Sequence, residues 1–258
     1  MRSLVLSFAL LLVTSCTASA PDDVRAAPPS FDGKNRVLSF DGLNDYATTG
    51  TAGFPIAYDP QTLMTWARPA RVVTGMDGGA SPSDEQSLVV VRKDFDSGVN
   101  LGLRNGSFEV WSVYSGRTYA RAGAPAAPGV WQHVAYSFDG SVHRLYVDGK
   151  LQNSSTEEPT NRTPTTAWLG SLDGYSDMFV GEIDEVRFYA AALDDATLAA
   201  LAAAGRGPAL AGPSAFVAWF GFDEVAGPRA VDRSGRGNDA LLGDGIPERM
   251  PERVIEVP

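Results

Sequence analysis

The acidic run Glu182, Asp184 and Glu185 is the part of this sequence that most suggests acid–base chemistry. Retaining glycoside hydrolysis uses two carboxyl groups about 5 to 5.5 Å apart. On a strand, only residues two apart point to the same face. Glu182, Asp184 and Val186 would then share one face, and Glu185 would point the other way with Arg187. Glu182 and Asp184 would be the only carboxylates on that face, with Val186 at the next alternate position.

Other catalytic patterns are missing from the sequence. It contains no Gly-x-Ser-x-Gly, no His-Glu-x-x-His and no phosphate-binding loop. The two histidines, His133 and His143, have no cysteine near them in sequence, and His133 lies close to Trp131. We read Trp66, Trp131 and His133 as packing residues rather than as metal ligands or bases. The chain is therefore expected not to be an enzyme.

Cys16 is the only cysteine, and it follows a charged start at Arg2, an apolar run from Leu4 to Val13 and two small residues. This pattern predicts a secretory signal peptide over residues 1–15, which is too short to span a bilayer. The segment resembles a bacterial lipobox, which implies a thioether-linked lipid on Cys16 and anchoring at the cell envelope, in the outer membrane. The alternative is an ordinary signal peptide with a chance cysteine.

Charge and composition limit the partners. The formal net charge is −10, lysine occurs only at Lys34, Lys93 and Lys150, and the arginines are dispersed. Nucleic-acid binding depends on clustered Lys and Arg, so no nucleic-acid partner is expected. Membrane contact is expected only through the N-terminal lipid. A single cysteine allows no disulfide within the chain, so a packed core must stabilise the fold.

Residues 16–35 are small, polar and proline-rich, which predicts a flexible tether. Residues 36–258 are read as one domain of short strands separated by Gly, Asp, Asn and Pro. Between Trp131 and Gln152, two Asp-Gly pairs predict two tight hairpin turns and three antiparallel strands. A helix is predicted from Asp195 to Ala204, capped by Asp194 and ended by Gly205.

Four segments resemble, in the expected order, the laminin G-like jelly-roll family of the concanavalin A-like lectin and glucanase superfamily. They are Leu38 to Thr49, Thr62 to Pro69, Gly129 to Leu151 and Gly181 to Leu201. The resemblance implies an all-β, two-sheet antiparallel jelly-roll sandwich with one short helix. It also implies roles that are mostly binding or adhesion, and function does not follow from fold alone. The superfamily also contains retaining glucanases, and the segment from Glu182 to Glu185 superficially resembles their signature strand. The third carboxylate of that signature is missing here, which argues against a hydrolase or lyase of this superfamily.

The C-terminal part contains a segment that resembles the strand and Asp-x-Ser-Gly loop with which this family begins. It runs from Ala215 to Leu242, and the sixteen residues after it are too few to hold the rest of a second repeat. We therefore predict a circular rearrangement in which residues 215–242 complete the sandwich. The alternative is the start of a truncated second copy.

The same resemblance implies a structural calcium ion at an edge of the sandwich, because many members of the family bind one. Oxygen ligands for it would come from Asp184, Asp223, Asp232 and Asn238. In the alternative, Asp232 and Asn238 only make side-chain bonds to the backbone of a turn, and Asp184 pairs with an arginine.

The function predicted from sequence is a surface-anchored, non-catalytic binding module. A carbohydrate site for a polysaccharide would use exposed aromatic residues, and Trp111, Tyr114, Tyr119 and Tyr175 are the candidates. Burial in the core is the alternative for each of them. Adhesion to a surface protein would instead use the loops at residues 74–86 and 153–166. The ligand and the oligomeric state stay open at this point.

Overall fold

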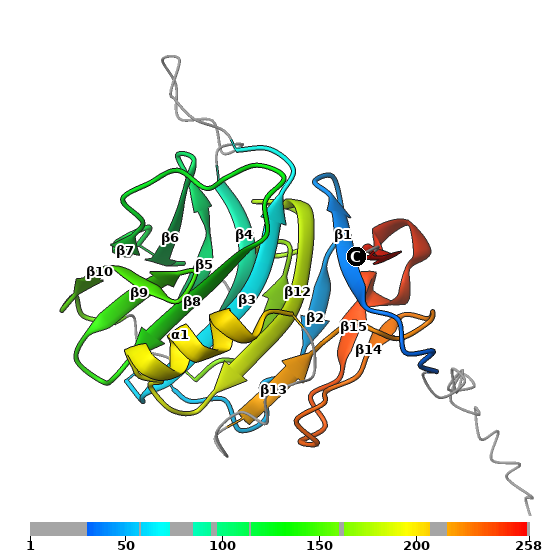
Figure 1. The fold of residues 1–258 in the computed structure, drawn as a ribbon. Helices are drawn as coiled ribbons and strands as arrows, with labels where there is room; N and C mark the ends of the chain where they lie inside the picture. The colour runs from blue at the N-terminus through cyan, green and yellow to red at the C-terminus, as the bar shows by residue number, and fades with distance from the viewer. Residues whose placement is uncertain are drawn as a thin grey trace, which may run out of the picture.

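The computed structural model describes residues 30–56, 58–72, 85–93, 97–113, 115–159, 163–206 and 216–256. In these residues two antiparallel β-sheets lie face to face, with one α-helix on the outside of the first (Figure 1). This confirms the predicted two-sheet sandwich. None of the helices in this part of the chain is long and apolar enough to cross a bilayer. The predicted signal peptide, Cys16 and most of the tether lie outside the described residues.

Each sheet contains eight of the described strands. In sheet I the spatial order is β10 (Lys150–Ser155), β9 (His143–Val147), β8 (Gln132–Phe138), β3 (Gln61–Pro69), β12 (Val180–Tyr189), β1 (Arg36–Asp41) and β16 (Glu252–Ile255), and β13 (Phe216–Phe220) also pairs with β12. In sheet II the order is β14 (Arg229–Ala230), β15 (Ala240–Leu242), β2 (Ala47–Thr49), β11 (Thr166–Leu169), β4 (Glu85–Lys93), β5 (Ser97–Arg104), β6 (Ser107–Ser112) and β7 (Thr118–Arg121).

The core lies between the two sheets and follows the alternation of each strand. On β8, Val134, Tyr136 and Phe138 all point inward, as their spacing predicts, and they are at most 1% exposed. Both predicted Asp-Gly turns join antiparallel strands, β8 to β9 and β9 to β10. One face of each strand therefore builds the core, and the other face is free to build surface features.

The helix α1 (Asp195–Ala204) packs on the outer face of sheet I. As predicted, the side chain of Asp194 accepts a hydrogen bond from the backbone N–H of Thr197, and Gly205 ends the helix with a φ of 76°. Leu198 and Leu201 are buried in a second apolar cluster, which includes residues of β3, β8, β9 and β12. The helix lies across these strands in Figure 1 and leaves the end of sheet I where β12 begins uncovered.

The C-terminal segment contributes strands to both sheets. β13 pairs with the second half of β12, while β14 and β15 extend sheet II next to β2. Two short 3₁₀ turns, at Gly243–Gly245 and Pro247–Arg249, then lead the chain to β16, which pairs with β1. The N-terminal strand β1 therefore lies between β12 and the last strand of the chain.

Candidate functional site

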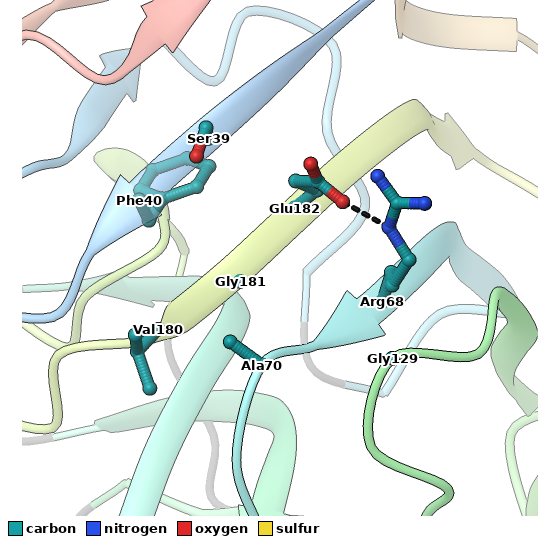
Figure 2. Close-up of a pocket in the computed structure, with 8 residues that line it drawn as sticks. All are labelled: Ser39, Phe40, Arg68, Ala70, Gly129, Val180, Gly181 and Glu182. Atoms are coloured by element: carbon teal, nitrogen blue, oxygen red, sulfur yellow. Dashed lines mark hydrogen bonds and ion pairs between the residues drawn. The ribbon is translucent and has the colours of Figure 1, made fainter. Parts of the chain in front are cut away.

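A pocket of about 320 Å³ opens at the end of sheet I, where β1 and β3 finish and β12 begins (Figure 2). The loop between β7 and β8 reaches the same place. The volume is at the lower end of the range of ligand pockets, about 300 to 1,000 Å³. The lining residues are Ser39, Phe40, Arg68, Ala70, Gly129, Val180, Gly181 and Glu182.

Close backbone packing frames the pocket. Gly181 has a φ of 143°, and a Cβ atom there would lie 2.4 Å from the carbonyl oxygen of Arg68, so only glycine fits. The backbone N–H of Ala70 donates to the carbonyl of Val180 at 3.0 Å. The N–H of Gly129 donates to the carbonyl of Pro69 at 2.8 Å, which fixes the loop against the end of β3.

Arg68 and Glu182 are the charged groups of the pocket. They are register partners on β3 and β12, and the Nε of Arg68 donates to Oε2 of Glu182 (Figure 2). Their side chains are 33% and 18% exposed. This pairing raises the pKa of Arg68, so the guanidinium stays charged. Among the described residues, the two terminal nitrogens of Arg68 and Oε1 of Glu182 have no hydrogen-bond partner.

Trp131 continues the charged surface away from the pocket. The guanidinium carbons of Arg68 and Arg206 lie 5.0 Å and 4.1 Å from the centre of its ring. Its Nε1 donates to Oε1 of Glu256 at 2.8 Å. Burial opposes ionisation of Glu256, but the bonds from Arg206 and Trp131 outweigh it, so its pKa is lowered. Trp131 is half-buried on the outer face of sheet I and is not a core residue.

The prediction that Glu182, Asp184 and Val186 share one face of the strand is wrong at Val186, whereas Glu185 does lie beside Arg187. β12 has a bulge at this point, so that two of its residues, Glu185 and Val186, stand opposite one residue of β3. Glu185 has a φ of 52°, and its carboxylate accepts from Arg187 at 2.6 Å. Val186 packs into the core instead of sharing a face with Asp184. The bulge breaks the alternation that the sequence argument assumed.

Burial determines which of the three carboxylates can reach a ligand. Asp184 is 0% exposed and Glu185 is 1% exposed. Burial, followed by the charge of Glu185, raises the pKa of Asp184 well above its usual value. Of the three acidic residues, only Glu182 lines the pocket.

The four predicted calcium ligands do not fit a shared ion. Both carboxylate oxygens of Asp232 accept backbone N–H groups, and the side chain of Asn238 bonds to backbone groups at residues 52 and 217. Asp223 pairs with Arg233 at 2.6 Å. Asp184 is fully buried, and its carboxylate lies 3.8 Å from the guanidinium of Arg206. The described part of the chain contains no group of three His, Cys, Asp or Glu residues suited to a metal. The alternative of turn bonds agrees with this geometry.

The predicted aromatic ligand residues do not come together. Trp111 and Tyr119 are each 2% exposed, so the expectation that they bind sugar is wrong. Trp111 lies beneath the guanidinium of Arg104, which is 4.3 Å from its ring centre, and Tyr119 stacks in the core. Tyr114 lies outside the described residues. Tyr175 is 80% exposed, in the loop that leads into β12.

Sequence reasoning missed Arg68 and Ser39 as site residues. Arg68 belongs to the segment that resembles a family strand. The one signal in the sequence is that Arg68 lies two residues after Trp66, which places both side chains on the same face of the strand. The pairing of β3 with β12 is also needed, because it brings Arg68 opposite Glu182. Ser39 reaches Glu182 from the other side of β12 through the pairing with β1.

A sequence-family model described as the concanavalin A-like lectin/glucanases superfamily matches residues 40–199. No curated protein sequence matches the chain. The matched range contains most of the residues that line the pocket.

Solved structures share the fold at low sequence identity. A candidate carbohydrate-binding protein from Bacteroides ovatus has a TM-score of 0.62 at 16% identity, over 87% of this chain and 60% of its own. A heptameric SAP-like pentraxin from Limulus polyphemus has a TM-score of 0.55 at 13% identity, over 83% of this chain and 97% of the pentraxin. Domain 4 of the extracellular arabinanase AbnA from Geobacillus stearothermophilus, in complex with arabinotriose, has a TM-score of 0.50 at 20% identity, over 67% and 80%. These likenesses show the fold alone, and the chain spans 60% of the length of the first protein.

Proposed function

The chain belongs to the concanavalin A-like lectin/glucanase superfamily, and from this membership we propose that it is a non-catalytic carbohydrate-binding module. The proposed site is the pocket beside Arg68 and Glu182. The structural neighbours from Bacteroides ovatus and Geobacillus stearothermophilus support the proposal, because the first is described as carbohydrate-binding and the second was solved with arabinotriose.

The observation that carries the proposal is the composition of the pocket. Arg68 offers free N–H donors and Glu182 offers a free acceptor, next to walls formed in part by Ala70 and Val180. A sugar ring presents both hydroxyl groups and apolar C–H surfaces, so it can use both kinds of wall. Small-molecule sites commonly combine an apolar lining with a few fixed polar groups in this way.

The proposed lack of catalysis is supported by the carboxylates that are accessible at the site. Glycoside hydrolysis needs two carboxyl groups that flank the bond to be cleaved. In the pocket, Glu182 is the only carboxylate among the lining residues, and it is paired with Arg68. Asp184 and Glu185 are buried on the same strand and cannot act on an external ligand.

A protein partner is the second candidate, favoured by exposed apolar side chains at the same end of the sandwich. Leu43, Val130 and Tyr175 are 77%, 53% and 80% exposed. Leu43 follows β1, Val130 follows Gly129 of the pocket, and Tyr175 precedes β12. Aromatic and apolar anchors of this kind occur in protein interfaces.

A glycan array probed with the purified protein tests the proposal. We expect binding to at least one glycan class and no release of reducing ends. Glu182→Gln and Arg68→Gln should each weaken binding about tenfold or more, because each removes a hydrogen bond to a charged group. The matched controls are Glu157→Gln and Arg117→Gln, which alter an exposed ion pair outside the pocket and should leave affinity unchanged. Binding to no glycan, or equal affinity in all four variants, would contradict the proposal.

We propose in addition that the module is displayed on the cell envelope by a lipid on Cys16, across the tether of residues 16–35. The support is the signal pattern before Cys16 and the lack of any other cysteine. Cells supplied with a labelled fatty acid should incorporate it into the wild-type protein and not into the Cys16→Ser variant. Equal labelling of the two proteins, or no labelling of either, would show that this anchor is wrong.

A further inference from the structure

We infer that the pocket selects uncharged sugars: Arg68 and Glu182 together bind two neighbouring hydroxyl groups, and sugars that carry a carboxylate are rejected. This inference rests on the proposed carbohydrate-binding function and adds the class of ligand.

The ion pair presents one free acceptor beside free donors. Oε2 of Glu182 is occupied by Nε of Arg68, which leaves Oε1 and the two terminal guanidinium nitrogens for a ligand. One hydroxyl of a vicinal diol can donate to Oε1 while its neighbour accepts from Arg68. A carboxylate can only accept, so it would bond to Arg68 and meet the like charge of Glu182 at close range.

Other acidic groups lie on the β1 side of the pocket and add to this repulsion. Glu252 is the register partner of Ser39 on β16, and Asp41 ends the same strand as Ser39. Asp45 lies beside them: burial, then the charges of Asp41 and Glu252, raise its pKa to about 6.

Glu256 also faces Arg68, and it is itself paired with Arg206. Five carboxyl groups, those of Glu182, Glu252, Asp41, Asp45 and Glu256, have therefore been named in or near the pocket, against the two arginines Arg68 and Arg206. The chain as a whole carries a net charge of −10. Both the local and the overall charge disfavour an anionic ligand.

The size of the pocket fits a short portion of a glycan. About 320 Å³ is near the minimum for a small-molecule site, and backbone contacts at Gly181 and Gly129 fix its walls. The pocket should therefore bind the end of a glycan chain or a glycan branch, where a diol is free to enter.

Matched oligosaccharides that differ only in oxidation at C6 test the inference. The neutral probes are tetramers of glucose, mannose and galactose, and each is compared with the tetramer of its uronate. The glucosamine tetramer serves as a cationic probe. For the sugar that binds, we expect the neutral tetramer to bind at least tenfold more tightly than its uronate. If a uronate or the glucosamine tetramer binds as well or better, the selectivity is wrong and carbohydrate binding stands. If neither these probes nor the array binds, the proposed function itself fails.

A charge-removing variant tests whether Glu182 is the cause. In Glu182→Gln the neutral tetramer should bind more weakly, and its advantage over the uronate should fall to threefold or less, because the like charge is gone. Glu157→Gln should keep the full advantage. The melting temperature of each variant is measured first. We expect it to change little, because both side chains of the ion pair are partly exposed. An unchanged advantage in folded Glu182→Gln would overturn the inference.

Discussion

His143 is a core residue whose charge state is fixed by its surroundings. Its ring stacks on Tyr119 and Phe138 with centroids 4.1 Å and 4.3 Å away, and its two nitrogens bond to the Tyr136 hydroxyl and the Glu157 carbonyl. Burial lowers the pKa of His143 to about 4. The unfolded chain takes up the proton near pH 6.5, so stability falls as the pH drops from 6.5 to about 4.

Other buried groups act over the same range. Burial, followed by the charge of Arg187, lowers the pKa of His133 to about 4, so His133 adds to the loss of stability in acid. Asp45 and Asp177 act in the opposite direction, because burial first and nearby carboxylates second raise the pKa of each to about 6. These two carboxyl groups stabilise the fold fully below about pH 3.8, and that contribution is lost as the pH rises to 6. The two effects partly cancel between pH 4 and 6.

Replacing Asp177 with asparagine should separate the two effects. The side chain keeps its size, and asparagine tolerates the positive φ of 49° at this position. We expect Asp177→Asn to be more stable than the wild type at pH 7 and close to it at pH 4, because the cost of burying the ionised form is removed. Urea unfolding at pH 4, 5, 6 and 7 measures this. Parallel pH profiles of the two proteins would contradict it.

At the scale of the element, α1 and β12 differ in how far local sequence determines them. The start and end of α1 follow from Asp194 and Gly205, which act on the nearest turn of the helix. The bulge at Glu185 depends on Arg187 and on Trp219, whose Nε1 donates to the Glu185 carboxylate. Trp219 comes from β13, more than thirty residues later, so no local pattern could reveal the bulge.

The C-terminal strands are expected to be indispensable to the sandwich. Val217, Phe220, Phe222 and Leu242 are all at most 2% exposed within the core. Loss of even one large core side chain costs about 2 to 5 kcal/mol, against a total stability of about 5 to 15 kcal/mol. A chain that ends at Gly212 should therefore show no cooperative unfolding transition on heating.

The control for this truncation is a chain that ends at Glu256, which keeps β16 and the bond from Trp131. It should melt like the full chain. If the chain ending at Gly212 melts at that same temperature, residues 215–242 are an appendage and the sandwich is complete without them.

At the scale of the whole molecule, patterns in the sequence predicted the sandwich, the β8–β9–β10 hairpins and the inward face of β8. They could not predict the site. Trp111 was ambiguous because its burial depends on Arg104, which covers the ring, and on Gly102, which leaves room beneath it. The pairing of Arg68 with Glu182 joins strands more than one hundred residues apart. Properties that depend on such long-range pairing need the structure.

The position of β1 also constrains how the chain can fold. β1 (Arg36–Asp41) pairs with β12 and with β16 (Glu252–Ile255), which lies more than two hundred residues later in the sequence. Contacts between residues so distant in sequence slow folding, because a long loop must close before they form. During synthesis, β1 therefore lacks both of its sheet neighbours until β12 and then β16 have been made, and sheet I is completed only at β16.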